Sequence, residues 1–101
     1  MNTVGTITPA EIKRRIANGE TLNLIDVRED DEVALGMIPG AKHIPLGQIP
    51  QRHQEITRSG EIILVCRSGG RSGKACDYLQ SIGYEGLKNM TGGMLEWANE
   101  A

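Results

Sequence analysis

Two patterns of apolar and polar positions alternate along the chain: short uninterrupted apolar runs, and longer stretches with apolar residues at helical spacing. The uninterrupted runs predict strands. The clearest is Glu61–Val65, because a continuous apolar run is typical of a strand covered on both faces. Shorter runs predict further strands at Asn23–Val27, around Lys42–Ile44 and at Gly86–Met90.

Helices are predicted between these strands. Thr8 and Pro9 are suited to an N-cap and a first helical position, Glu11 completes a capping box, and Gly19 ends this helix. Another helix, over Arg71–Ile82, follows the clearest strand. Its predicted apolar face consists of Ala75, Tyr78, Leu79 and Ile82.

Three further helical segments complete the pattern. They are a short acidic helix or turn that stops at Gly36, a helix over Pro50–Thr57, and a final helix whose packing residues are Met94, Leu95 and Trp97. The alternation of strands and helices predicts an α/β fold with a mostly parallel sheet. In such sheets ligands bind beyond the carboxyl ends of the strands, which is where Cys66 follows the clearest strand.

Composition narrows the class of protein. The 101 residues suit a single domain over 1–101, and with no Phe, one Trp and two Tyr the core must be aliphatic. So few aromatic residues also argue against a surface that stacks nucleic-acid bases. The net charge of −2 and the pI near 5.6 predict no general attraction to nucleic acid or to anionic membranes. Any cationic site must therefore be local.

Targeting and metal signals are absent from the sequence. No stretch has the length of a signal-peptide core or a membrane span, so we expect a cytoplasmic protein. The sequence does not indicate an oligomeric state, and our default expectation is a monomer or a weak dimer. Cys66 and Cys76 are the two cysteines, and a reducing compartment would keep them as thiols. No Cys/His spacing resembles a zinc site, so we expect no metal and no cofactor.

The segment after the clearest strand combines a thiol with glycine and positive charge. Between Cys66 and Arg71, at the predicted helix start, lie only four residues: Arg67, Ser68, Gly69 and Gly70. Glycine lets backbone N–H groups turn inward, and at a helix N-terminus such a loop becomes a nest for an anion. The two arginines add whole charges, so the thiol is expected to ionise easily.

The size of this effect decides whether a separate base is needed. An ordinary cysteine has a pKa near 8.5 and is about 3% thiolate at pH 7, whereas thiols at helix N-termini beside cations reach roughly 3.5–7.5. A thiolate would then be the main form of Cys66, a nucleophile without a histidine partner. The alternatives are that Cys66 is only a small buried residue and that the glycine pair only forms a turn. The Rossmann and P-loop patterns of nucleotide-binding loops are absent.

Four motifs, in order, resemble those of the single-domain rhodanese family of sulfurtransferases. They are DVRE at Asp26–Glu29, GMIPGAKHIPL at Gly36–Leu46, CRSGGRS at Cys66–Ser72 and GGMLEW at Gly92–Trp97. The resemblance covers nearly the whole chain and implies a five-stranded, mostly parallel sheet flanked by helices on both faces. One departure is Met37, which replaces a histidine that the family often has, and we expect it to change packing rather than activity.

The resemblance also implies a reaction. Cys66 takes the outer sulfur of thiosulfate or a related persulfide donor and passes it from a persulfide to cyanide or to a thiol acceptor. The backbone from Arg67 to Arg71 cradles that sulfur, and the two arginines contact the anion. Ser68 and Ser72 are further hydrogen-bond donors, although Ser72 equally suits a helix cap. With no lid domain or long insertion in the sequence, the site is expected to be shallow and open, which also suits a protein sulfur acceptor.

Two alternatives share the fold. Dual-specificity phosphatases and arsenate reductases have five residues between cysteine and arginine, whereas this chain has four between Cys66 and Arg71. A loop that is one residue shorter suits a single sulfur atom better than a tetrahedral phosphate or arsenate. Non-catalytic docking or regulatory modules of the family commonly lack the cysteine, whereas Cys66 is present here. Its presence favours activity and leaves open a relay role that passes sulfur to a protein acceptor.

The remaining polar residues have expected supporting roles. Asp26 and Arg28 follow a strand at the same sheet edge and are predicted to brace the active loop. Cys76 could resolve an oxidised Cys66, but a small buried residue of the helix is favoured. Other residues are expected to be structural or on the surface: His43, His53 and the acidic run Glu29–Glu32.

Overall fold

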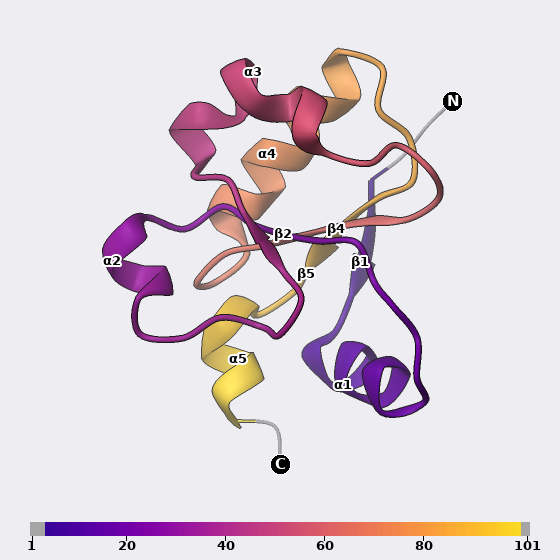
Figure 1. Cartoon of the computed structure of the whole chain (residues 1–101), viewed down its shortest axis with the longest axis vertical. Helices are drawn as coiled ribbons and strands as arrows, with labels where there is room; N and C mark the ends of the chain where they lie inside the picture. Colours follow the sequence, from indigo (N-terminus) through magenta and orange to yellow (C-terminus); the bar gives the residue numbers. More distant parts are fainter. Residues whose placement is uncertain (1–3, 100–101) are drawn as a thin grey trace.

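The fold is built around one sheet in which every pair of neighbouring strands is parallel (Figure 1). The computed structural model describes residues 4–99. The strands lie in the order β1-β5-β4-β2-β3. Their bounds are β1 Gly5–Ile7, β2 Leu24–Asp26, β3 Lys42–His43, β4 Ile62–Val65 and β5 Leu87–Met90. The predicted α/β class is confirmed, and the sheet has the five strands that the resemblance implied.

Helices cover both faces of this sheet (Figure 1). The helices are α1 Pro9–Ala17, α2 Asp30–Val33, α3 Ile49–Arg52, α4 Gly70–Ser81 and α5 Gly93–Asn99. Residues of α3 and α4 pack against one face, and residues of α1 and α5 against the other. The core therefore has two layers, which the central strand β4 joins.

Strand β4 explains why the clearest apolar run is also the most buried. Its side chains alternate between the layers, with Ile62 and Leu64 toward α4 and Ile63 and Val65 toward α1. All four side chains are buried, so polar residues do not alternate with apolar residues along this strand. Cys66 is the next residue and lies in the layer that contains α4.

The start of α1 is confirmed with one difference. Thr8 is the N-cap, and its hydroxyl accepts from the Glu11 N–H at 3.2 Å. The predicted capping box is only half present, because the Glu11 carboxylate accepts instead from Arg14, one turn further along the helix, at 3.4 Å. Gly19 ends this helix with a φ of +89°, a conformation that glycine adopts easily.

Three predictions about helices are wrong. Leu95 of the final helix does not pack in the core with Met94 and Trp97, because its side chain is 48% exposed. The segment Pro50–Thr57 is not one helix: α3 stops at Arg52 and a 3₁₀ turn follows over His53–Glu55. The carbonyl of His53 accepts from the Tyr84 hydroxyl at 2.6 Å and from the Ile56 N–H, so it is not available to continue an α-helix. Ile82 does not belong to the buried face of α4, because the helix ends at Ser81 and this side chain is exposed.

Strand β1 has no counterpart among the strands predicted from local patterns. It contains only three residues, of which Thr6 is exposed and Ile7 is buried. Such a short edge strand leaves too few positions for a recognisable period. It forms because its backbone pairs with β5, with Ile7 opposite Met90.

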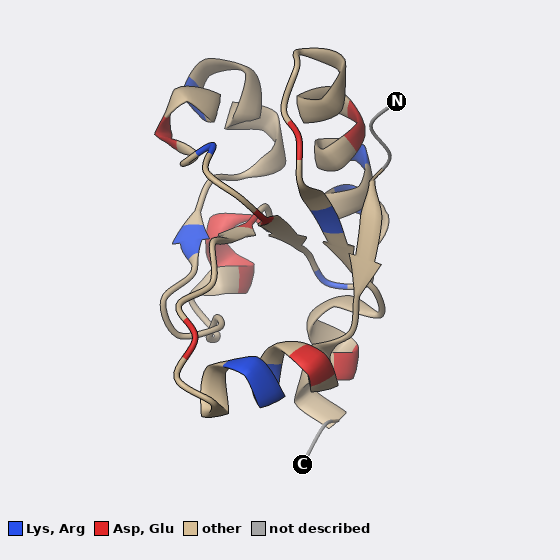
Figure 2. Cartoon of the chain, turned by 90° about the vertical axis from the view of Figure 1, so that its right-hand side faces the viewer, with Lys and Arg blue, Asp and Glu red and all other residues tan. Residues whose placement is uncertain are grey.

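In the view of Figure 2, positively and negatively charged residues are interspersed along the ribbon. This agrees with a local rather than a general cationic site. Within residues 4–99, no helix is long and apolar enough to span a membrane. The same residues hold no group of three or more His, Cys, Asp and Glu side chains that could bind a metal ion.

Candidate active site around Cys66

The carboxyl ends of β2 and β4 bring two sequence motifs together. These strands are neighbours in register, with Asp26 opposite Val65. The Val27 N–H donates to the Val65 carbonyl at 2.8 Å and continues the pairing beyond the strand ends. Cys66 and Arg28 therefore leave the sheet at the same edge, where ligands bind in parallel sheets.

The loop after Cys66 folds back over its sulfur. The Gly69 N–H donates to Sγ at 3.0 Å, and the Ser72 hydroxyl lies 3.3 Å from Sγ. Gly69 has a φ of +105°, so this position favours glycine. Helix α4 begins at the next residue, Gly70, one position before the predicted start.

These contacts set the charge state of the thiol. Burial by itself raises the pKa of Cys66. Hydrogen bonds from the Ser72 hydroxyl and from the N–H groups of Ser72, Gly69 and Ser68 more than offset burial, so the pKa lies below its ordinary value. The predicted direction is confirmed. The identified causes of the lowering are hydrogen-bond donors, whereas the sequence also pointed to the arginines.

Ser72 connects this sulfur to strand β5. Its hydroxyl lies within hydrogen-bond distance of three acceptors: Sγ of Cys66, the Gly69 carbonyl at 3.2 Å and Oδ1 of Asn89. A hydroxyl has one proton, so these acceptors compete for it. The Asn89 side chain also donates to the Gly69 carbonyl at 3.0 Å. Asn89 therefore supports both the loop and the serine.

The sequence patterns did not point to Asn89. Locally, Asn89 is only a polar residue in a short strand, between Lys88 and the buried Met90. Strand alternation places Asn89 on the same side as Leu87, which packs in the layer of α4. Its partners lie 17 and 20 positions away in the sequence, so only the packing of α4 against β5 reveals the contact.

The N-terminus of α5 closes the loop from the other side. The Met94 N–H donates to the Cys66 carbonyl at 2.8 Å, and the Leu95 N–H donates to the Arg67 carbonyl at 3.0 Å. Gly93 has a φ of +57°, and a Cβ there would overlap the backbone of Arg67 and Ser68. Glycine at the first position of this helix thus allows the helix backbone to touch the Cys66 loop.

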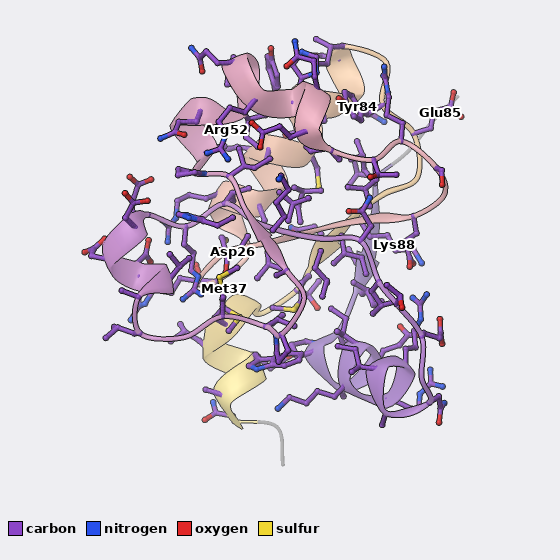
Figure 3. All side chains as sticks on the ribbon, viewed as in Figure 1. Asp26, Met37, Arg52, Tyr84, Glu85 and Lys88 are labelled. Carbon is purple, nitrogen blue, oxygen red and sulfur yellow. The ribbon has the colours of Figure 1, made fainter. Side chains whose placement is uncertain are left out.

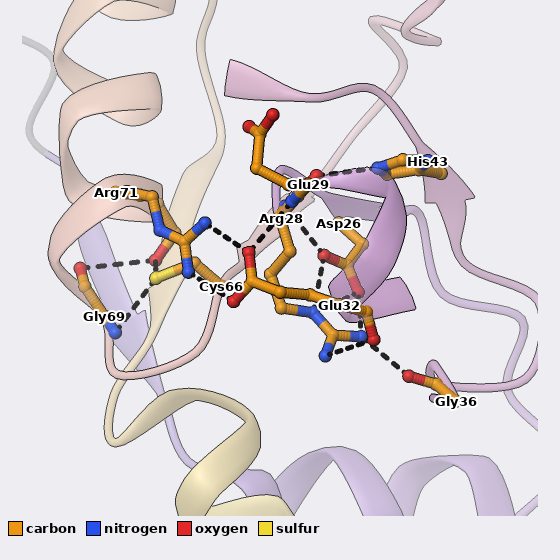
Figure 4. A network of polar contacts seen from close by, with 10 residues as sticks. Asp26, Arg28, Glu29, Glu32, Gly36, His43, Cys66, Gly69 and Arg71 are labelled. Carbon is orange, nitrogen blue, oxygen red and sulfur yellow. Dashed lines mark hydrogen bonds and ion pairs between the residues drawn. The ribbon is translucent and has the colours of Figure 1, made fainter. Parts of the chain in front are cut away.

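Arg71 is held by a carboxylate of the acidic run (Figure 4). Its two terminal nitrogens donate to Glu32 at 2.6 and 2.8 Å. Hydrogen bonds from Arg71 are the largest cause that lowers the pKa of Glu32 to about 2. The prediction that Glu32 belongs to a merely solvated face is wrong, because α2 places it beside the loop. A direct contact of Arg71 with a substrate anion stays a prediction.

Asp26 and Arg28 form a buried ion pair that supports α2 (Figure 4). Arg28 donates to both Asp26 carboxylate oxygens, at 2.8 to 3.1 Å, and to the Gly36 carbonyl at 2.8 Å. It also lies 3.4 Å from the Glu32 carbonyl. The pair thus fixes both ends of the segment that presents Glu32 to Arg71. The Asp26–Arg28 pair therefore supports the Cys66 loop indirectly, through the contact of Glu32 with Arg71.

The other predicted site residues lie along the mouth of the loop. Arg67, Ser68 and Gly70 are exposed, and Gly69 is half-buried. The backbone of Arg67 is bound to α5, which leaves its guanidinium at the surface. The structure therefore gathers the residues predicted from the sequence, and it adds Glu32, Asn89 and Gly93.

Two histidines have structural contacts. His43 is half-buried, and its Nε2 lies 2.7 Å from the Arg28 carbonyl, as expected for a structural residue. His53 was predicted on a polar surface helix, but it is half-buried in a 3₁₀ turn and its Nδ1 lies 2.9 Å from the Tyr84 hydroxyl. Figure 3 shows Tyr84 at the end of the molecule that carries α3, away from Asp26 and Met37.

The comparisons with known proteins agree with this geometry. Residues 8–100 match the model of the rhodanese-like domain. The chain belongs to the rhodanese-like family. The family resemblance inferred from the four motifs is thereby confirmed.

Relatives of this rhodanese-like chain carry names of sulfur-transfer proteins. It is 46% identical over 94 residues to a putative sulfurtransferase of Bacillus subtilis, YtwF, an alignment that covers 93% of this chain and 90% of the relative. It is 29% identical over 106 residues to the human thiosulfate:glutathione sulfurtransferase, covering 91% of each. A rhodanese-like domain protein from Staphylococcus aureus has a similar structure, with a TM-score of 0.86, 35% identity and coverage of 93% and 91%. These similarities support sulfur transfer as the general chemistry.

Proposed function

We propose that the protein transfers a sulfane sulfur from thiosulfate, or from a related persulfide donor, to cyanide or to a thiol through a persulfide on Cys66. The observation that carries this proposal is the set of donors aimed at one buried sulfur, the Gly69 N–H and the Ser72 hydroxyl. Donors arranged in advance around a developing negative charge stabilise it without reorganisation.

In the first step the Cys66 thiolate attacks the outer sulfur of thiosulfate. A bond forms between the two sulfurs, and the bond to the sulfonate sulfur breaks, which releases sulfite with its electron pair. The products are the Cys66 persulfide anion and sulfite, so atoms and charge balance. The pKa of Cys66 is lowered because hydrogen bonds outweigh burial, and this shift favours the thiolate that acts as the nucleophile.

The persulfide anion takes up a proton from water, and in the second step this protonated persulfide gives its outer sulfur to an acceptor. Cyanide attacks that sulfur, the bond to Cys66 breaks, and thiocyanate and the free thiol result. An acceptor thiolate reacts in the same way and leaves as a persulfide. The loop donors stabilise the negative charge on Cys66 when it acts as the leaving group, so the same donors assist both steps.

Mass spectrometry of the intact protein tests the proposal. Incubation with thiosulfate is expected to add the mass of one sulfur atom, and cyanide or dithiothreitol is expected to remove it. The Cys66→Ser protein is expected to show no adduct. Failure of thiosulfate, glutathione persulfide and mercaptopyruvate alike to give an adduct would overturn the catalytic proposal.

The length of the loop supports sulfur transfer over phosphate or arsenate chemistry. Four residues separate Cys66 from Arg71, and the Gly69 N–H is already directed at the sulfur itself. A variant with one residue inserted between Gly69 and Gly70 is expected to gain phosphatase activity on an aryl phosphate relative to the wild type. Equal hydrolysis by both proteins would contradict this use of loop length.

We further propose that the protein works as a monomer or weak dimer in the cytoplasm. Cys66 and Cys76 are both free thiols, which suits a reducing compartment. In this proposal a protein thiol is a second kind of acceptor beside the small molecules. Size-exclusion chromatography and cell fractionation test these proposals.

A further inference from the structure

An open cleft lies between the end of α2 and the start of α5. Its volume is about 260 Å³, and its walls are Leu35 and Gly36 on one side and Arg67, Met94 and Leu95 on the other. This is enough space for a small organic group but not for a folded segment of another protein. The active loop does not fill the cleft.

The cleft borders the loop that follows Cys66, because Arg67 is one of its lining residues. Two of its residues, Met94 and Leu95, donate backbone hydrogen bonds to the carbonyls of Cys66 and Arg67. On the opposite wall Glu32 holds Arg71, at the other end of the active loop. A molecule in this cleft would therefore lie against the loop that carries Cys66, between the residues that hold its two ends.

Exposed apolar side chains concentrate at this place. Large hydrophobic residues with high exposure are Leu35, Leu95 and Ile82 within residues 4–99, and the first two flank the cleft. Leu35 is 91% exposed and Leu95 is 48% exposed. Apolar surface grouped around a functional cleft is typical of a binding site, whereas a single exposed residue needs no explanation.

The charge of the cleft is positive. Of its charged residues, Arg28 is paired with Asp26, and Glu32 is paired with Arg71. Arg67 is exposed, and the ion pairs found within residues 4–99 do not include it. The cleft thus combines two leucines with one cation that has no carboxylate partner.

We propose that this cleft binds the organic part of a small acceptor thiol that has an apolar stem and a terminal carboxylate. The inference rests on the proposed function. The stem would lie between Leu35 and Leu95, and the carboxylate would meet Arg67. The thiolate attacks the outer sulfur of the Cys66 persulfide, a new sulfur–sulfur bond forms, and Cys66 leaves as the thiolate.

Single-turnover transfer from the preformed persulfide tests the stem. The protein is loaded with thiosulfate, freed of donor, and mixed with mercaptopropionate, with mercaptohexanoate, which has three more methylenes, or with cyanide. The second-order rate constant for mercaptohexanoate is expected to exceed that for mercaptopropionate by about tenfold, because each partly buried methylene contributes up to about threefold to fourfold.

Variants assign the effect to the cleft. Leu35→Ser and Leu95→Ser are each expected to reduce the mercaptohexanoate-to-mercaptopropionate ratio to about threefold or less. Ile82→Ser is the matched control, since Ile82 is also exposed but lies beyond the far end of α4, and it is expected to keep the wild-type ratio. Because the same two thiols enter the ratio for every protein, their intrinsic reactivities cancel when the wild type and the variants are compared.

A second comparison tests the charge. Mercaptohexanol has a similar stem without the carboxylate, and it is expected to react about threefold to tenfold more slowly than mercaptohexanoate with the wild-type persulfide. Arg67→Gln is expected to remove this preference. Lys74→Gln, which removes an exposed cation on α4, is expected to retain it.

The outcomes separate this inference from the proposed function. If thiosulfate forms no persulfide, or if cyanide does not discharge it, the proposed function fails and the inference fails with it. If cyanide discharges the persulfide but the stem ratio is the same in the wild type and the leucine variants, only the inference is overturned. A faster reaction with leucyl-cysteinyl-aspartate than with mercaptohexanoate would also overturn it and assign the cleft to a polypeptide.

Discussion

The two cysteines of this chain share a layer of the core but differ in their surroundings. Cys66 precedes α4 and is 1% exposed, and Cys76 lies within α4 and is 0% exposed. Burial raises the pKa of both thiols, and for Cys76, with a smaller effect of Asp77, it raises the pKa to about 12. For Cys66, donors from the loop and from Ser72 outweigh burial and lower the pKa.

The difference shows that burial does not decide the reactivity of a thiol by itself. A buried sulfur without donors is an inert apolar group, whereas one surrounded by N–H and O–H donors is stabilised as an anion. Only Cys66 lies where loop N–H groups and the first turn of a helix converge. Cys76 lies one to two turns further on, where the backbone donors are used within the helix.

Replacing each cysteine by serine is expected to reveal the largest difference between the two sites, in the rate of sulfur transfer. Cys66→Ser is expected to reduce sulfur transfer by about 10³-fold or more, because the hydroxyl is not ionised at neutral pH and cannot form a persulfide. Cys76→Ser is expected to retain transfer within about threefold, since this side chain only fills space. Steady-state thiocyanate formation measures both. A matching loss in Cys76→Ser would give that residue a role in the reaction.

Gly93→Ala is expected to disturb the Cys66 loop while leaving Cys76 in place. The added Cβ would overlap the backbone of Arg67 and Ser68, at a glycine with a φ of +57°. A loss of about 2–4 kcal/mol in the free energy of unfolding is expected. Urea denaturation measures it, with Gly47→Ala as the control, because nothing lies within 4 Å of a Cβ at Gly47. Equal stability of the two variants would contradict the close contact of α5 with the loop.

Ser72→Ala makes the surroundings of Cys66 more like those of Cys76. Burial already raises the pKa of Cys66, and loss of the Ser72 hydroxyl removes the largest of the causes that lower it. The pH profile of iodoacetamide alkylation is therefore expected to move to higher pH, with a rate at pH 7 about fivefold lower. Ser81→Ala, at the exposed far end of the same helix, is the control. An unmoved profile in Ser72→Ala would leave the backbone donors as the whole cause.

Glu32→Gln has the smallest expected effect. Hydrogen bonds from Arg71 hold the pKa of Glu32 at about 2, below its ordinary 4.5, so this pair stabilises the fold above about pH 4.5 and loses that contribution as the pH falls toward 2. The variant is expected to lose about 0.5–1 kcal/mol in the free energy of unfolding at pH 7, since both side chains are partly exposed.

Urea denaturation at several pH values checks this prediction. The difference between wild type and Glu32→Gln is expected to shrink between pH 5 and pH 3. Asp31→Asn, which changes an exposed neighbour in the same acidic run, is the control. A difference that stays constant over this range would mean that the carboxylate charge of Glu32 does not contribute to stability.

Local sequence was sufficient for features that depend on a few consecutive residues. The apolar run Ile62–Val65 and the glycines after Cys66 determined a buried strand and a tight loop at a helix start. Thr8 determined the start of α1 for the same reason, since a cap involves residues three positions apart. Local patterns were insufficient for β1, which depends on pairing with β5, and for the segment after Arg52, where Tyr84 binds the His53 carbonyl.

The sequence by itself therefore determined the candidate nucleophile, the length of its loop and the alternation of strands and helices. Only the tertiary structure decided which carboxylate holds Arg71, which side chain of β5 supports Ser72 and where a cleft opens beside Cys66. The physical reason is that these features join residues far apart in the sequence, 39 positions for the contact of Arg71 with Glu32 and 17 for that of Ser72 with Asn89. Their partners are set by strand order, register and helix packing, which no short stretch of sequence contains.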